Sequence, residues 1–184
     1  MIKKIILLLV IATTLAGIYT GSYLSLTKSR KYIKSISTSR AEKTLESFIE
    51  TFDQVFEYNA PVSEIEIIKF FGGDIIATVI NGGQSEDSSR KLIKYIEKHS
   101  DKNEFLQVYS LATTYQGLWR KHKAQVDFDM SLKYFEKARS IGPNLPQPLY
   151  NLFDMYRAKQ DFDKAKEMGN SILANWDDQR VKDI

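Results

Sequence analysis

The sequence predicts an all-α protein, with a single membrane helix at the N-terminus followed by a short array of helical hairpins. Three observations lead to this fold class. Residues 5–26 are apolar and uncharged, apolar residues recur three or four positions apart between Ile33 and Phe56, and large, small and Pro positions recur within residues 128–179. The chain is 43% hydrophobic with only 9 Gly and 4 Pro, which suits a folded helical protein and argues against a disordered one.

The N-terminal run has the length of a membrane span. Its sequence, IILLLVIATTLAGIYTGSYLSL, follows Lys3 and Lys4, and as a helix it measures roughly 30 Å, about the hydrocarbon thickness of a bilayer. One interpretation is an uncleaved anchor covering residues 1–27, and the other is a signal peptide cleaved after Ala16. The run stays apolar up to Leu26, which favours the anchor and places residues 5–26 in the membrane.

Two signals disagree about the side of the membrane on which the rest of the chain lies. The basic residues that come after the run outnumber Lys3 and Lys4, and the positive-inside rule then favours a cytoplasmic C-terminal part. A short Lys-Lys start before an apolar run instead favours export of the C-terminal part. We expect the soluble part on the exported side.

Charge and composition exclude several kinds of function. Residues 1–40 hold seven Lys or Arg and no acidic residue, whereas residues 41–184 hold 19 basic and 23 acidic residues, so nucleic acid is not an expected partner. The absence of Cys excludes disulfides and thiol nucleophiles. His99 and His122 lie in no metal-ligand spacing, and no GxSxG motif is present. We expect no catalytic residue, no metal and no cofactor.

Residues 28–60 predict one long helix or stalk, which can continue directly from the anchor. No Pro or Gly occurs in this segment before Pro61, and the helix is expected to end before Asn59. Phe48, Phe52 and Phe56 recur every four residues, and we interpret them as core residues.

Residues 61–100 predict the helical first part of a soluble domain. A short helix over residues 62–71 is expected to stop at Gly72-Gly73, and Asp74 is expected to cap a second short helix over residues 75–80. A further helix begins at Ser85 or Asp87 and ends at His99.

Residues 101–184 predict two helical hairpins, over about 105–144 and 146–179. Asp101-Lys102-Asn103-Glu104 fits a capping box, from which a helix runs to Leu118. Trp119-Arg120-Lys121-His122-Lys123 is then expected to form a loop inserted before the next helix, which Phe128 opens. In the second hairpin Gly169 costs about 1 kcal/mol of helix stability relative to Ala.

The two hairpins resemble the tetratricopeptide repeat, a helix pair of about 34 residues. The matching positions are Leu111, Ala112 and Tyr115, then Phe128, Ser131, Phe135, Ala138 and Pro143, and then Leu149, Leu152, Tyr156, Phe162 and Ala165. Gly169 departs from the pattern, since an aromatic residue is usual there. Ala138 and Ala165 lie where two helices approach closely, and Pro143 lies just past a helix end.

The resemblance implies a concave face that binds a protein partner. The expected partner-binding residues are Tyr109, Thr113, Gln116, Tyr150, Asp154 and Arg157. The alternative is an ordinary solvated or packed helix surface. The Lys and Asn clamp with which some family members hold chaperone tails is absent, so that activity is not expected. Separately, Trp119, Arg120, Lys121 and Lys123 form a possible loop for an anion or an acidic partner, the alternative being a solvated turn.

A second resemblance concerns residues 52–172. With the segment YFEKARSIGPNLPQPLYNL, this region is similar to the helical-repeat tail of bacterial O-antigen ligase and polymerase proteins. It implies a protein of the bacterial inner membrane that assists cell-surface polysaccharide assembly, with a multi-helix membrane protein as partner.

These observations predict a membrane-tethered adaptor or scaffold that binds a protein partner through its concave helical face. The alternative is an accessory subunit in O-antigen-like polysaccharide assembly. A third hypothesis, an enzyme with an unrecognised site, requires polar residues with shifted pKa values gathered in a pocket.

Overall fold

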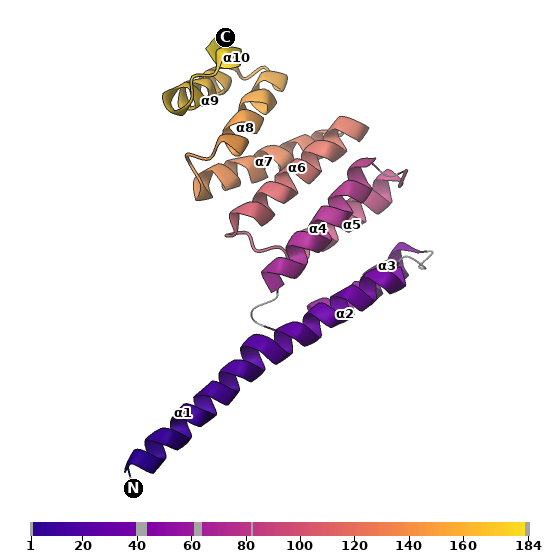
Figure 1. Ribbon diagram of the computed structural model, residues 1–184. Coiled ribbons are helices and arrows are strands. Elements are labelled where there is room, and N and C mark those ends of the chain that lie inside the picture. Colours follow the sequence, from indigo (N-terminus) through magenta and orange to yellow (C-terminus); the bar gives the residue numbers. More distant parts are fainter. Residues whose placement is uncertain (1, 40–43, 61–63, 82, 183–184) are drawn as a thin grey trace. The chain divides into compact units, whose positions relative to one another are not determined.

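The protein is all-α, as the sequence predicts. The computed structural model describes residues 2–39, 44–60, 64–81 and 83–182, and no strand occurs among them (Figure 1). The elements are α1 (Ile2–Ile18), a π-helical segment η1 (Tyr19–Tyr23), α2 (Leu24–Ser39), α3 (Leu45–Phe56), α4 (Glu64–Asn81), α5 (Glu86–His99), α6 (Phe105–His122), α7 (Gln125–Ile141), α8 (Pro146–Ala158), α9 (Phe162–Asn175) and α10 (Gln179–Lys182). The chain forms two compact units, Met1–Phe71 and Gly72–Ile184, which divide inside α4.

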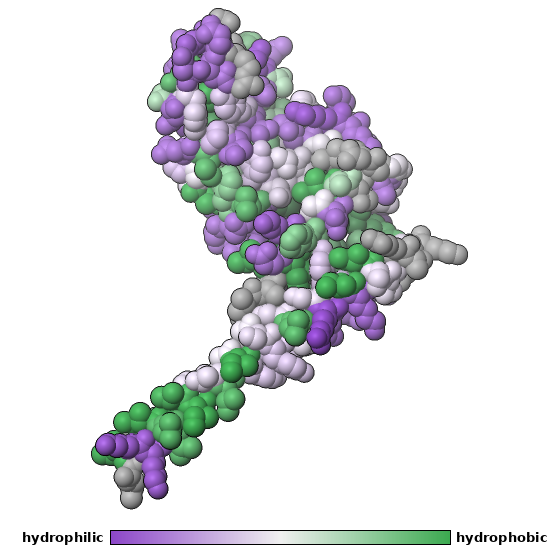
Figure 2. All heavy atoms as spheres, in the orientation of Figure 1, coloured by the Kyte–Doolittle hydropathy of each residue, from purple (hydrophilic) through white to green (hydrophobic). Residues whose placement is uncertain are grey.

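In the first unit, α1, η1 and α2 join into one helix over Ile2–Ser39 that is long and apolar enough to cross a membrane. The large apolar side chains of α1 are exposed, and Figure 2 shows apolar residues covering this helix beyond a hydrophilic start. The expected continuity of the apolar run with the following helix is confirmed. A signal sequence near an N-terminus can contain an apolar helical segment that meets the same criteria of length and composition, so both interpretations of the run remain open.

The single helix predicted over residues 28–60 is wrong, because α2 and α3 are separate helices packed against each other. Thr44 has an extended backbone and its side chain accepts a hydrogen bond from the Ser47 N–H, which starts a new helix at Leu45. The two helices bury Tyr32 and Phe52, whose ring centroids lie 6.1 Å apart. Burying these aromatic rings offsets the loss of helical continuity.

The predicted stop at Gly72-Gly73 is also wrong, since α4 continues from Glu64 to Asn81. Phe71 and Ile75, on either side of the glycine pair, are each only 2% exposed. Their burial outweighs the helix cost of two glycines, about 1 kcal/mol each. Val62 and Ser63, which belong to the helix predicted there, lie outside the described residues.

The helix predicted from Ser85 or Asp87 to His99 is confirmed as α5. Ser85 is the N-cap, and its side chain accepts a hydrogen bond from the Ser88 N–H. In the second unit α5 packs against α6.

The capping box predicted before α6 does not form as expected. Glu104 itself is the N-cap, and its carboxylate accepts a hydrogen bond from the Gln107 N–H at 2.8 Å. Asp101 instead accepts from the Asn103 N–H within the turn. The Glu104 carboxylate thus satisfies a free N–H group in the first turn of α6, and the helix begins after Glu104, whereas the capping box requires it to begin after Asp101.

Helices α6 and α7 form a tightly packed hairpin (Figure 1). Ala112 and Ser131 are fully buried where the two helices meet, and Ala138 is fully buried further along α7. Pro143 follows the end of α7 at Ile141, as predicted. Helices α8 and α9 form a second hairpin, in which Ala165 is fully buried. Small residues therefore occupy buried positions in both hairpins.

Gly169 allows the C-terminal segment to close the second hairpin. A Cβ atom at this position would lie 3.1 Å from Val181 Cγ1 and 3.4 Å from Phe153 Cε2. Val181 of α10 is 5% exposed, whereas Trp176, the C-cap residue of α9, is only half-buried. Val181 and Phe153 thus fill the space left by the missing side chain of Gly169.

Candidate functional site

Asn151 in α8 connects the two helices that carry the predicted partner-binding residues. Its side-chain Nδ2 donates a hydrogen bond to the Tyr109 hydroxyl at 3.1 Å, and its Oδ1 accepts from Gln116 Nε2 at 3.3 Å. Nδ2 also donates to the Gln147 carbonyl oxygen at 2.8 Å. The structure therefore brings Tyr109 and Gln116 of α6 together around one amide side chain of α8.

The three predicted residues of α6 are mostly occupied by contacts within the protein. Tyr109 stacks against Phe105 and meets Phe135 edge-on. Gln116 is 7% exposed, and Thr113 is half-buried with its hydroxyl donating to the Ser110 carbonyl oxygen. These three residues are therefore largely covered by other parts of the protein, and they expose little side-chain area that a partner could contact.

The three predicted residues of α8 lie at intervals of four and three positions, so they share one face of the helix. The Tyr150 hydroxyl donates to Asp178 Oδ2 at 2.5 Å, which ties it to the C-terminal segment. Asp154 and Arg157 are exposed, and the Arg157 guanidinium lies 5.4 Å from the centroid of the buried Phe153 ring. Asp154 and Arg157 are accordingly the accessible members of the predicted set.

The predicted anion-binding loop is not a loop. Trp119, Arg120 and Lys121 belong to the last turns of α6, and Lys123 is its C-cap with a positive φ of 59°. Trp119 packs edge-on against Phe128, and the Lys123 ammonium lies 5.3 Å from the Trp119 ring centroid. The extra residues lengthen the hairpin, and their positive charges lie where the helix dipole favours cations.

Acidic groups lie beside this basic helix end. His122 Nδ1 is 3.9 Å from a Glu86 carboxylate oxygen. Arg90 pairs with both Glu86 and the fully buried Asp127, donating to Asp127 Oδ2 at 2.8 Å. The hydrogen bond from Arg90 lowers the pKa of Glu86, and both carboxylates raise the pKa of Arg90. The Arg90–Asp127 ion pair joins α5 to α7 beside this helix end, and the arrangement does not provide an open anion site.

Two glutamates accept hydrogen bonds from tyrosines of later helices, and no sequence pattern predicted these three contacts. Glu97 of α5 accepts hydrogen bonds from the hydroxyls of Tyr115 and Tyr134, whose rings are stacked with centroids 5.8 Å apart. Glu136 of α7 accepts from the Tyr156 hydroxyl of α8. Burial, together with these carboxylates, raises the pKa of all three tyrosines well above the usual value of 10.0. A carboxylate that accepts two tyrosine hydroxyls is not recognisable from spacing.

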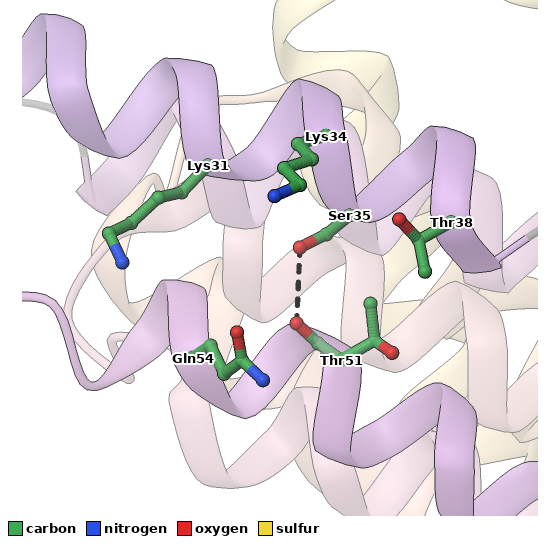
Figure 3. A pocket seen from close by; sticks show the side chains of 6 residues that line it. All are labelled: Lys31, Lys34, Ser35, Thr38, Thr51 and Gln54. Carbon is green, nitrogen blue, oxygen red and sulfur yellow. Dashed lines mark hydrogen bonds between the residues drawn. The ribbon is translucent and has the colours of Figure 1, made fainter.

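A small cleft lies between α2 and α3 in the first unit. It measures about 240 Å³ and is lined by Lys31, Lys34, Ser35, Thr38, Thr51 and Gln54 (Figure 3). The Ser35 hydroxyl donates to the Thr51 carbonyl oxygen at 3.1 Å, which holds the two helices together along the cleft. The sequence did not predict this cleft, because a single continuous helix was expected over both elements.

Within the part of the chain that the structure describes, no group of three or more His, Cys, Asp or Glu side chains is arranged to hold a metal ion. A comparison with models of protein families and a search of curated proteins found no match to this chain.

Proposed function

We propose that this protein is a membrane-tethered adaptor with a tetratricopeptide-like array, and that the face formed by α6 and α8 binds a protein partner. The observation that carries the proposal is the pair of hydrogen bonds that join Asn151 to Tyr109 and Gln116. They hold the residues of α6 beside the stripe of α8 that contains Asp154 and Arg157, so one surface spans both hairpins.

The accessible groups on this surface suit a polypeptide partner. Asp154 offers a carboxylate and Arg157 a guanidinium, three residues apart on one helix face. The buried Phe153 ring lies against the Arg157 guanidinium, which reduces the entropy that Arg157 loses on binding. Arginine is common among residues that dominate binding energies at protein interfaces, because it supplies several directed donors and a flat stacking surface.

The N-terminal helix supplies the tether in this proposal. With residues 5–26 in a bacterial inner membrane and the array on the exported side, a partner in the same membrane meets the array at a raised effective concentration. At that concentration a weak contact through Asp154 and Arg157 is sufficient to hold the partner. This arrangement suits a multi-helix membrane protein as partner.

The test is purification of the tagged full-length protein in mild detergent. Asp154→Ala/Arg157→Ala is compared with the parent and with Lys133→Ala/Lys137→Ala, which changes two exposed residues of α7. We expect a partner with the parent and the control that is lost with Asp154→Ala/Arg157→Ala. Tyr150 is left intact because its bond to Asp178 supports the C-terminal segment.

Equal recovery of the partner with all three proteins would place the contact outside the α6/α8 face. Recovery of a polysaccharide-assembly enzyme, with altered surface glycan on deletion of this protein, would favour the accessory-subunit alternative.

A further inference from the structure

Helix α2 carries a concentration of positive charge directly after the apolar run. Lys28, Arg30, Lys31 and Lys34 lie within seven positions of one another, and α2 contains no acidic residue. Lys28 is fully buried, whereas Arg30, Lys31 and Lys34 are exposed. Three exposed positive charges therefore begin four residues beyond Leu26.

Two of these charges line the cleft between α2 and α3. Figure 3 shows the side chains of Lys31 and Lys34 from α2 and of Gln54 from α3 extending into the same space. The Lys31 ammonium lies 5.2 Å from the centroid of the Tyr58 ring, which positions it at one end of the cleft. Among the residues that the structure describes, no carboxylate lines the cleft, although α3 carries Glu50 and Asp53 elsewhere.

The remaining lining residues present hydroxyl and amide groups. Thr38 and Gln54 are exposed, so the Thr38 hydroxyl and the Gln54 amide can donate hydrogen bonds to a ligand. Two ammonium groups with a hydroxyl and an amide match the oxygen atoms of a phosphate group. The volume of about 240 Å³ is below that of a typical drug-sized site and suits a small polar group.

The position of the cleft along the helix is set by the rise of 1.5 Å per residue. Lys31 and Lys34 lie about 7.5 Å and 12 Å beyond Leu26 along the axis. The polar headgroup layer of a bilayer is about 5–8 Å thick on each side, and a helix tilt of about 20° brings both lysines closer to it. Long lysine side chains can also reach along the helix toward that layer.

We propose that the cleft between α2 and α3 binds the phosphate-bearing headgroup of an anionic lipid. The inference rests on membrane insertion of residues 5–26, which belongs to the proposed function, but not on the α6/α8 face. Lys31 and Lys34 neutralise the phosphate charge, and Thr38 and Gln54 donate hydrogen bonds to its oxygens. Lipid binding at this site fixes the α2–α3 hairpin at the membrane surface.

The experiment measures bound lipid by native mass spectrometry of the full-length protein in mild detergent, with phosphatidylglycerol or phosphatidylcholine of matched acyl chains added. Lys31→Gln/Lys34→Gln is compared with Arg30→Gln/Lys69→Gln, which removes two exposed positive charges outside the cleft. Gln54→Leu removes a polar group from the cleft at constant charge. Helical circular dichroism confirms that each variant is folded.

We expect the parent to retain phosphatidylglycerol in preference to phosphatidylcholine. The Lys31→Gln/Lys34→Gln variant should lose binding on the order of tenfold, Gln54→Leu about threefold, and the Arg30→Gln/Lys69→Gln control at most about twofold. Equal losses in the two double variants, or no loss in Gln54→Leu, would overturn the proposal in favour of diffuse attraction between charges.

Two further measurements separate the possible sources of the phosphate and the two proposals. Inorganic phosphate added in excess should leave the phosphatidylglycerol adduct in place, and its replacement by a phosphate adduct would overturn the lipid assignment. Alkaline extraction of membranes that contain each variant tests the tether. Protein that stays in the membrane without a preference for phosphatidylglycerol contradicts only the headgroup site, whereas release into the soluble fraction contradicts the tether.

Discussion

The hydroxyl of Ser131 in α7 donates a hydrogen bond to the carbonyl oxygen of Ala112 in α6, at 2.9 Å, and both residues are fully buried. The bond brings the side chain of one helix against the backbone of the other. Such a contact requires a small side chain at each position, and it sets the spacing of the α6–α7 hairpin.

Enlarging Ala112 should therefore destabilise the protein more than removing the Ser131 hydroxyl. We expect Ala112→Leu to lower the free energy of unfolding by about 1–3 kcal/mol through overpacking, and Ser131→Ala by about 1 kcal/mol through the lost hydrogen bond. Ser140→Ala, which alters an exposed hydroxyl bonded within its own helix, is the control. Urea unfolding followed by helical circular dichroism measures all three variants. An unchanged free energy of unfolding in Ala112→Leu would contradict the close approach of α6 and α7 at this position.

The ion pair between Arg90 and Asp127 should contribute more than its neighbour on the surface of α5. Asp127 is fully buried and Arg90 donates to both of its carboxylate oxygens. We expect Asp127→Asn to cost about 1–3 kcal/mol, because a charge-assisted pair is lost beneath the surface. Asp87→Asn breaks the exposed pair with Lys91 and should cost less than about 0.5 kcal/mol. Similar unfolding midpoints for the two variants would refute the assigned role of Asp127.

Alkaline pH should lower the stability of the folded state, because two tyrosine hydroxyls that donate hydrogen bonds to Glu97 lose their protons. Burial first, and then Glu97, raises the pKa of Tyr115 and Tyr134 above 10.0, so the folded state holds these protons more tightly than the unfolded state. Their stabilising contribution is complete below pH 10 and falls as pH rises through the folded-state pKa. Unfolding midpoints measured from pH 8 upward should decline less steeply above pH 10 in Tyr115→Phe/Tyr134→Phe than in the parent.

Lys102 provides an internal check on this pH dependence. Its side chain lies over the Tyr134 ring, and burial lowers its pKa from 10.5. A lowered lysine pKa acts in the opposite sense, since it favours the folded state as pH rises. The double variant retains Lys102, so the difference in slope between variant and parent reports on the tyrosines. Parallel slopes would show that the pKa values of the two hydroxyls are not raised in the folded protein.

Local patterns in the sequence predicted much of this fold. The spacing of apolar residues identified α5 to α9, Ser85 identified the start of α5, and the small residues Ser131, Ala138 and Ala165 occupy buried positions. These features depend on helical periodicity and on side-chain size, which a sequence states directly. The long apolar helix at the N-terminus follows from length and composition in the same way.

Features that depend on competition between neighbours were not predictable. The serine- and threonine-rich end of α2 and the cap at Thr44 separate α2 from α3, although the apolar stripe is compatible with one continuous helix. Because Phe71 and Ile75 are buried, α4 continues through Gly72 where the sequence predicts that a helix ends. Asn151 and Glu97 gain their roles from partners at least 18 residues away, and no local pattern marks such contacts.

Gly169 offers a test of how the C-terminal segment closes the array. Replacing a helical glycine with alanine normally stabilises a helix by about 1 kcal/mol, but here the new methyl group would lie 3.1 Å from Val181 Cγ1. We expect Gly169→Ala to give little gain in the parent and a gain of up to about 1 kcal/mol when Val181→Ala has removed the obstructing methyl groups.

The unfolding free energies of the parent, the two single variants and the double variant form a double-mutant cycle. We expect Gly169→Ala to stabilise the protein more in the Val181→Ala background than in the parent. Additive effects of the two substitutions would mean that α10 does not pack on Gly169 in solution. A coupled result would explain why residue 169 departs from the tetratricopeptide pattern that the sequence resembles, because Val181 occupies the space that an aromatic side chain there would fill. Introducing an aromatic residue at position 169 should then displace α10 and expose the segment around Val181 to proteolysis.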